Sequence, residues 1–291
     1  MILRRHVPLA LAGCLAACRQ KPVLADAGTY DAFHAPEDVA IVGYDGDVME
    51  PFLTRDGRNL LFNNRNEPPE NTDLHWAKRV DDLTFQYLGE IPGVNTNALE
   101  GVPSMDRDGN LYFVSTRSYD KTWSTIYRAR LGGTPELVEG VSRRTAGWVN
   151  FDAEISADGK TLYFVDGYFG SAGYPQKASI ACAVVAGNGF RRRGDSARTF
   201  ENVNGPGLQY APNVSADELE LFITRVTKME RSAQPGIYRS VRSAIDGTFT
   251  SPRRVSAIQG FAEGSTLSPD GRSLYYHARV GEKYRLRRVT R

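Results

Sequence analysis

The stretch "FDAEISADGKTLYFVDG", residues 151–167, consists of two runs of strand-forming residues separated by Asp158-Gly159. The Asp-Gly pair provides the positive-φ position that a tight hairpin turn needs, because glycine adopts it without a Cβ clash. The same arrangement occurs at 49–64, 101–115, 210–224 and 263–277. The turn aspartates, which lie 50 to 59 residues apart, are Asp56, Asp108, Asp158, Asp217 and Asp270. This self-similarity predicts five copies of one structural unit.

A period of about fifty residues with several short strands per copy is typical of a β-propeller, with one four-stranded antiparallel blade per copy. The fifth copy reaches Arg291 after only three predicted strands, and "DVAIVGY" (38–44) is the only strand-like run before the first copy. We therefore predict an all-β, five-bladed propeller over residues 38–291, with the last blade closed by this N-terminal strand. In the fourth copy Glu218 replaces the turn glycine, which predicts about 1 kcal/mol of strain or another turn type.

The first residues, "MILRRHVPLALAGCLAAC", have the charged, apolar and small-residue layout of a secretory signal, and the apolar part is too short to span a bilayer. "LAAC" (15–18) resembles the bacterial lipobox, in which the cysteine is acylated. "LAGC", ending at Cys14, fits the same pattern, and an ordinary secretory signal is a further alternative. We predict a lipoprotein signal peptide over 1–17, lipidation of Cys18 and a tether over 18–37. In the lipobox pattern Arg19 favours the outer membrane, so the expected location is the periplasm.

Charge and cysteine content exclude several classes of protein. Removal of Arg4 and Arg5 with the signal leaves 34 basic and 34 acidic residues, whereas a nucleic-acid-binding protein normally has a basic excess. Cys182, the single cysteine outside the signal, lies in the apolar run "ASIACAVV" and is expected to be a small buried hydrophobe. No Cys/His spacing supports zinc and no cofactor fingerprint occurs. We therefore expect no metal, no cofactor and no nucleic acid, and a monomer that meets the membrane only through its lipid.

"LSPDGRSLYY" (267–276) is similar to the TolB-like, WD-like propeller repeat of bacterial envelope proteins, whose core is Ser-Pro-Asp-Gly-Lys/Arg followed by an apolar triplet. "ISADGKTLYF" (155–164) and "FLTRDGRNLLF" (52–62) fit it more loosely. The resemblance covers residues from about 38 to the end. TolB itself has six blades and an N-terminal α/β domain, so the resemblance implies a related propeller rather than TolB. It implies little about function, because one fold serves many functions.

Acidic residues recur where the innermost strands should line the central channel. Counted back from the turn aspartate, Glu50 and Asp152 share position −6, and Asp152 and Glu154 at −4 should face the same side of a strand. The candidate catalytic residues are Glu50, Asp152, Glu154 and Glu263. Carboxylates at these positions also commonly cap loop N–H groups or pair with an arginine of the next blade. The neutral residues at −6 in the other copies (Val102, Ala211 and Gly264) leave room for a ligand.

The predicted ligand-binding residues add an acid and two aromatic side chains to these candidates; the full set is Glu50, Glu100, Trp148, Asp152, Glu154, Tyr210 and Glu263. Tyr210 is also expected to pack between blades. The loops "GVNTNALEGVPS" (93–104) and "NVNGPGLQYAPN" (202–213) resemble each other. They reflect either duplicated blade architecture or a shared cleft.

Two functions follow. The first is a lipid-anchored periplasmic module that binds an envelope protein or a carbohydrate without chemistry of its own. The alternative is a five-bladed glycoside hydrolase in which channel-mouth carboxylates act as acid and base. Carboxylate geometry separates the two: in a hydrolase two carboxyl groups should face one pocket, about 5–5.5 Å apart in a retaining enzyme or about 6.5–9.5 Å in an inverting one. Catalysis loses its basis if each carboxyl group instead bonds an arginine or a backbone N–H of its own blade.

Overall fold

The computed structural model describes residues 28–291 except 68–70, 171–173 and 228–232. The predicted signal peptide and both lipidation candidates, Cys14 and Cys18, therefore lie outside the described residues. About half of the described residues lie in short β-strands. The helices in it are two single turns, α1 (Tyr119–Thr122) and α2 (Ser196–Thr199). None of the helices in the described part of the chain is long and apolar enough to cross a bilayer.

Each sequence repeat forms four antiparallel neighbours, or three in the fifth repeat. The first repeat contains β4 (Met49–Leu53), β5 (Asn59–Asn63), β6 (Leu74–Arg79) and β7 (Thr84–Glu90). The second contains β8 (Glu100–Met105), β9 (Asn110–Ser115), β10 (Ile126–Arg130) and β11 (Glu136–Leu137). The third contains β12 (Trp148–Ile155), β13 (Thr161–Tyr168), β14 (Lys177–Ala186) and β15 (Gly189–Arg192). The fourth contains β16 (Leu208–Val214), β17 (Glu220–Val226), β18 (Gly236–Val241) and β19 (Arg253–Val255). The fifth contains β20 (Ala262–Leu267), β21 (Ser273–Val280) and β22 (Lys283–Thr290).

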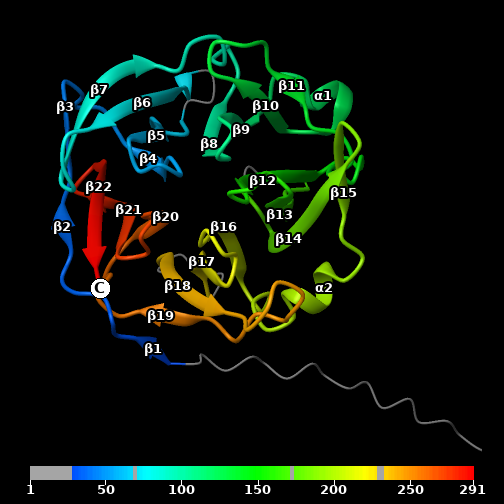
Figure 1. Ribbon diagram of the computed structural model, residues 1–291. Helices are drawn as coiled ribbons and strands as arrows, with labels where there is room; N and C mark the ends of the chain where they lie inside the picture. Colours follow the sequence, from blue (N-terminus) through cyan, green and yellow to red (C-terminus); the bar gives the residue numbers. More distant parts are fainter. Residues whose placement is uncertain (1–27, 68–70, 171–173, 228–232) are drawn as a thin grey trace, which may run out of the picture.

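The sheets of the repeats are arranged around a common centre, with the first strand of each repeat innermost (Figure 1). The first strands of successive repeats pack against one another, and β20 of the fifth repeat packs against β4 of the first. The third and fourth repeats share one sheet only through a single parallel bridge, Ala178 to Leu208. The second strand of each repeat is almost wholly buried, as its apolar triplet predicts.

Hydroxyl side chains fix the hairpin turns. Ser156, two residues before the turn aspartate, donates its hydroxyl to Asp158 at 2.7 Å, and Ser268 donates to Asp270 at 2.6 Å. Such Asx and Ser/Thr turns satisfy backbone groups locally. In the fourth turn Glu218 has φ +57°, so a non-glycine residue occupies the left-handed position, as one of the two predicted outcomes requires. Its carboxylate accepts a hydrogen bond from the hydroxyl of Tyr163 in the third repeat, which offsets the strain.

The N-terminal segment pairs with three repeats rather than one. β1 (Thr29–Tyr30) runs parallel to β19, β2 (Glu37–Asp38) runs antiparallel to β22, and β3 (Ala40–Val42) runs parallel to β7. The predicted closing strand, 38–44, is therefore misplaced: Glu37 and Asp38 pair with the fifth repeat, whereas residues 40–42 pair with the first. The predicted tether, 18–37, also overlaps the fold, because Thr29 and Tyr30 are already in a sheet.

Candidate functional site

A β-bulge interrupts the innermost strand of every repeat. In each repeat the pairing register between the first and second strands shifts. The shift spans the residue six positions before the turn aspartate. Those residues all have left-handed backbone angles: Glu50 (φ +46°), Val102 (+54°), Asp152 (+51°), Ala211 (+48°) and Gly264 (+51°). The left-handed conformation is costly for residues other than glycine and is found where surrounding structure enforces it, commonly at functional sites.

The bulges bring together carboxyl groups from the first, third and fifth repeats. We call this cluster the acidic mouth; it consists of Glu50, Asp152 and Glu263 with His277 and Tyr210. Burial is the larger cause of the raised pKa of Glu50. Like-charge repulsion from Asp152 and from Glu263 raises it further. One side-chain ligand atom of each of Glu50, Glu263 and His277 lies within 4.8 Å of the other two. Glu50 and Glu263 therefore converge, and Asp152 lies near enough for its charge to affect Glu50.

His277 helps to position the carboxylate of Glu263. The backbone N–H of Glu50 donates to His277 Nδ1 at 3.2 Å, so Nδ1 carries the lone pair and the proton of a neutral ring lies on Nε2. Nε2 is 3.3 Å from Glu263 Oε2, and Tyr210 donates its hydroxyl to Oε1 of the same carboxylate. Glu263 thus accepts hydrogen bonds from two side chains, which hold its carboxylate in place.

The same tautomer bears on metal binding. Glu50, Glu263 and His277 have the spacing of a small metal site, and transition metals accept such a set of oxygen and nitrogen ligands. A metal at Nε2 would require the proton to move to Nδ1, where it would meet the N–H of Glu50. His277 therefore serves to hold Glu263, and a cation at the mouth has only the carboxylates to bind.

Glu50 and Asp152 are held differently from Glu263. Burial and the neighbouring charges raise the pKa of Glu50 well above its usual range. Burial raises the pKa of Asp152 to about 7, although the Ala211 N–H, which donates to Oδ2 at 2.8 Å, opposes the shift. No described residue donates a hydrogen bond to the Glu50 carboxylate. The mouth therefore contains carboxyl groups in different protonation states near neutral pH.

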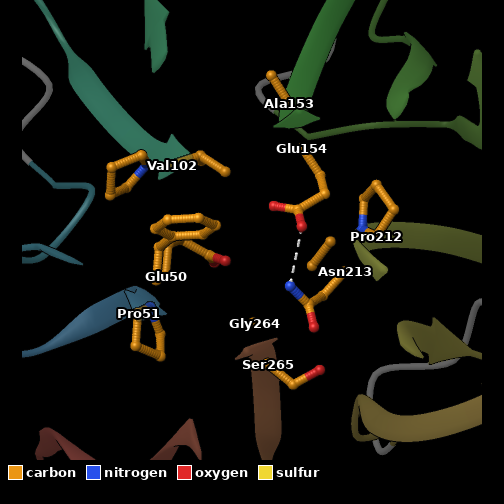
Figure 2. Close-up of a pocket in the computed structure, with 12 residues that line it drawn as sticks. Glu50, Pro51, Val102, Ala153, Glu154, Pro212, Asn213, Gly264 and Ser265 are labelled. Atoms are coloured by element: carbon orange, nitrogen blue, oxygen red, sulfur yellow. Dashed lines mark hydrogen bonds between the residues drawn. The ribbon is translucent and has the colours of Figure 1, made fainter. Parts of the chain in front are cut away.

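Below the acidic mouth lies a small cavity on the axis, lined by residues from all five repeats (Figure 2). Figure 2 shows Glu50 and Glu154 on opposite sides of it, with the amide of Asn213 hydrogen-bonded to Glu154 and with Ser265 on β20 of the fifth repeat. Its space for a water-sized group is about 20 Å³, roughly that of one water molecule. Three proline rings narrow its wall: Pro51, Pro103 and Pro212.

Glu154, a predicted catalytic residue, has a structural role. Its side chain accepts hydrogen bonds from Arg55 of the first repeat and Ser104 of the second, both at 2.8 Å, and from Asn213 of the fourth at 3.1 Å. Burial raises its pKa and the Arg55 charge opposes this. The prediction that Asp152 and Glu154 share one strand face is wrong, because the bulge between Phe151 and Glu154 breaks the alternation.

Glu100 and Trp148 also lie apart from the acidic mouth. Glu100 is fully buried and accepts hydrogen bonds from the Thr96 N–H (2.7 Å) and the Ser115 hydroxyl (2.6 Å). It therefore caps a loop, and its predicted role in ligand binding is not supported by these contacts. Trp148 is half-buried and packs at an interplanar angle of 47° against Tyr168 (5.3 Å between ring centres), and the guanidinium of Arg143 lies over the Trp148 ring at 4.4 Å. Tyr210 does reach the mouth, through Glu263.

Sequence analysis missed His277 and Ser265. A signal for His277 existed: Glu263 and His277 are equidistant from the turn at Asp270 and face each other in the hairpin register. The isolated histidine carried no motif, so it was not singled out. Cys182 is buried and unpaired, as expected.

No protein-family model matches the chain, and no curated protein matches it. Among solved structures it is similar to a thermostable family-43 glycoside hydrolase, with 13% identity, a TM-score of 0.56 and coverage of 87% of this chain and 91% of that one. The catalytic domain of the GH62 α-L-arabinofuranosidase of Coprinopsis cinerea has 11% identity, a TM-score of 0.54 and coverage of 90% and 98%. For TolB from Acinetobacter baumannii the identity is 20% and the TM-score 0.47, and the match covers 79% of this chain and 49% of TolB.

These likenesses are informative about the fold alone. The chain has the fold of a β-propeller, which confirms the all-β prediction. The two glycoside hydrolase structures support a propeller fold and assign no family to this chain.

Proposed function

We propose that the protein is a five-bladed β-propeller, held at the periplasmic side of the outer membrane by a lipid on Cys18, that binds an envelope protein or glycan at the acidic mouth. The observation that carries this proposal is the convergence of Glu50, Asp152 and Glu263 from three separate repeats. Unneutralised carboxyl groups destabilise a folded protein, so their placement at one opening is better explained by a ligand than by stability.

The five-bladed ring rests on strand pairing. Each of the five repeats supplies its own antiparallel strands, and β2 adds an outer strand to the fifth. Contact between β20 and β4 brings the last repeat against the first. The proposed lipid anchor is supported by the sequence around Cys18 alone. The proposed monomeric state is supported by the N-terminal segment, which pairs with the strands β7, β19 and β22.

Binding is tested with matched variants of the intact protein. Purified protein is titrated with soluble peptidoglycan fragments, neutral oligosaccharides and a peptide library, and binding is measured by calorimetry. We expect Glu50→Gln and Glu263→Gln each to weaken binding at least tenfold, and the exposed control Glu139→Gln to leave it unchanged. Equal ligand affinity of the three variants would show that the acidic mouth is not the binding site.

Glycoside hydrolysis is the second candidate, and the different surroundings of Glu50 and Glu263 favour it. Glu50, with its raised pKa, would give its proton to the leaving glycosidic oxygen while the Glu263 carboxylate attacks the anomeric carbon; water would then release the sugar and Glu50 would regain its proton. Their closest oxygens lie within 4.8 Å, near the roughly 5–5.5 Å separation of retaining enzymes. Release of reducing sugar that Glu50→Gln abolishes would establish this candidate. Binding without turnover keeps the first.

A further inference from the structure

The acidic mouth and the cavity beneath it differ from a general acidic surface in charge, hydrogen bonding and size. We propose that they recognise a primary ammonium group of the ligand, such as a lysine side chain or a free amino terminus. This inference rests on the proposed binding function and specifies the chemistry of the ligand.

The carboxyl groups of the mouth lack a strongly basic partner within the described part of the chain. No arginine or lysine there forms an ion pair with Glu50, Asp152 or Glu263; the basic side chain that contacts Glu263 is His277, whose Nδ1 accepts the Glu50 N–H. The two other inner-strand acids, Glu100 and Glu154, each have an arginine partner. A cationic ligand group would supply the missing charge.

A second and independent observation is the hydroxyl of Ser265. Ser265 is only 7% exposed, yet its Oγ has no hydrogen-bond partner among the described residues. It lines the same cavity as Glu50 (Figure 2), whose carboxylate also accepts no hydrogen bond from them. An unpaired buried polar atom costs about 1–3 kcal/mol. An ammonium group donates three hydrogen bonds and accepts none, so it matches a site with vacant acceptors.

Size selects among cations. The cavity holds about 20 Å³ for a water-sized group, which suits an ammonium head and is too small for the planar guanidinium of arginine. The prolines in its wall, Pro51, Pro103 and Pro212, resist widening because their backbone is fixed. A metal ion is disfavoured because the proton on Nε2 keeps His277 from coordinating it.

The test compares three small probes of matched shape on the intact protein. These are the N-acetyl, N-methylamide derivatives of lysine, arginine and norleucine, titrated by NMR and calorimetry at pH 7. We expect the lysine probe to bind at least tenfold more tightly than the other two. Glu50→Gln and Ser265→Ala should each weaken it severalfold, whereas Glu139→Gln should not.

The outcomes separate this inference from the function on which it rests. Equal binding of lysine and norleucine probes, tighter binding of arginine, or failure of the lysine probe to bind would each overturn it. Calcium that binds at the mouth and excludes the lysine probe would also overturn it, in favour of a metal. If the lysine probe fails while Glu50→Gln still weakens binding of an envelope peptide or glycan, the proposed function stands without the ammonium group.

Discussion

The residue six positions before each turn aspartate combines an unusual backbone with a position on the axis. Ala211 and Val102 adopt left-handed angles there without a polar group, whereas Glu50 and Asp152 add carboxyls. The bulge is therefore a property of the repeat, and the acid is an addition to it. Sequence position alone could identify this column, but it could not show that the backbone turns there.

At Gly264 the left-handed backbone favours glycine, and a close side chain leaves no room for a Cβ. Its φ is +51°, and a Cβ would collide with Oε2 of Glu50. We expect Gly264→Ala to displace the Glu50 carboxylate and to lower the free energy of unfolding by about 1 kcal/mol or more, measured by urea denaturation and ligand titration.

The control for this variant is Gly260→Ala. Gly260 has φ +75°, and no atom lies within 4 Å of the position of an added Cβ. It should show the backbone cost alone and leave ligand binding intact. Equal ligand affinity of Gly264→Ala and wild type would show that the glycine does not position Glu50.

The pKa of Asp152 predicts a pH dependence of stability. Its ordinary value of 3.8 is raised to about 7 in the folded protein, so between these pH values the folded state keeps a proton that the unfolded state has lost. Stability from this group therefore falls as pH rises from about 4 to 7. Asp152→Asn should flatten this decline, measured by urea denaturation at pH 4.5 and 7.5. The exposed control Asp246→Asn should keep the wild-type slope, and an unchanged slope in Asp152→Asn would contradict the assignment.

At the scale of elements, the two similar Asn-rich loops are explained by architecture. Asn95 accepts from the N–H of Leu74 at 2.9 Å and donates to its carbonyl at 3.1 Å. Asn204 makes the same pair of bonds with Ile180, at 2.8 and 2.9 Å. Each asparagine thus substitutes for a strand residue against the third strand of the preceding repeat.

This equivalence gives a paired prediction. Asn95→Ala and Asn204→Ala should each lower the free energy of unfolding by about 1–3 kcal/mol, because each leaves a buried N–H and carbonyl unsatisfied. The measurement is urea denaturation of both variants in parallel. Losses below about 0.5 kcal/mol in both would show that water replaces the side chain without cost.

Much of the fold followed from the sequence because the hairpin turns repeat with the same chemistry. The repeat period and the strands around each turn were predictable, and the acidic residues could be placed on the inner strands, but the sequence could not show which of them meet. Loop capping by Glu100 and the arginine pair of Glu154 match the alternative role stated for such carboxylates, but their partners, among them Arg55 and Thr96, carry no signal of proximity in the sequence. Strict strand alternation also failed, since no residue type marks a bulge.

At the scale of the whole molecule, Arg55 and Glu154 connect repeats across the axis. Arg55 belongs to the first repeat, Glu154 to the third, and their ion pair at 2.8 Å is almost fully buried. Arg55→Met should lower the free energy of unfolding by about 3–5 kcal/mol, because a buried carboxylate then lacks its partner.

The double variant Arg55→Met/Glu154→Gln removes both charges and is the control. We expect it to recover part of the lost stability, measured by urea denaturation alongside the single variant. A double variant no more stable than Arg55→Met would mean that packing, rather than the unpaired charge, causes the loss.

Strands near the start of the described chain pair with strands close to residue 291. Glu37 and Arg288 are 251 positions apart and bonded, and Arg291 bonds both Tyr30 and Glu220. During synthesis β3 meets its partner β7 early, whereas β1 and β2 lack their partner strands until β19 and β22 have been made. Products that lack β19 and β22 would leave β1 and β2 open to pairing with other chains.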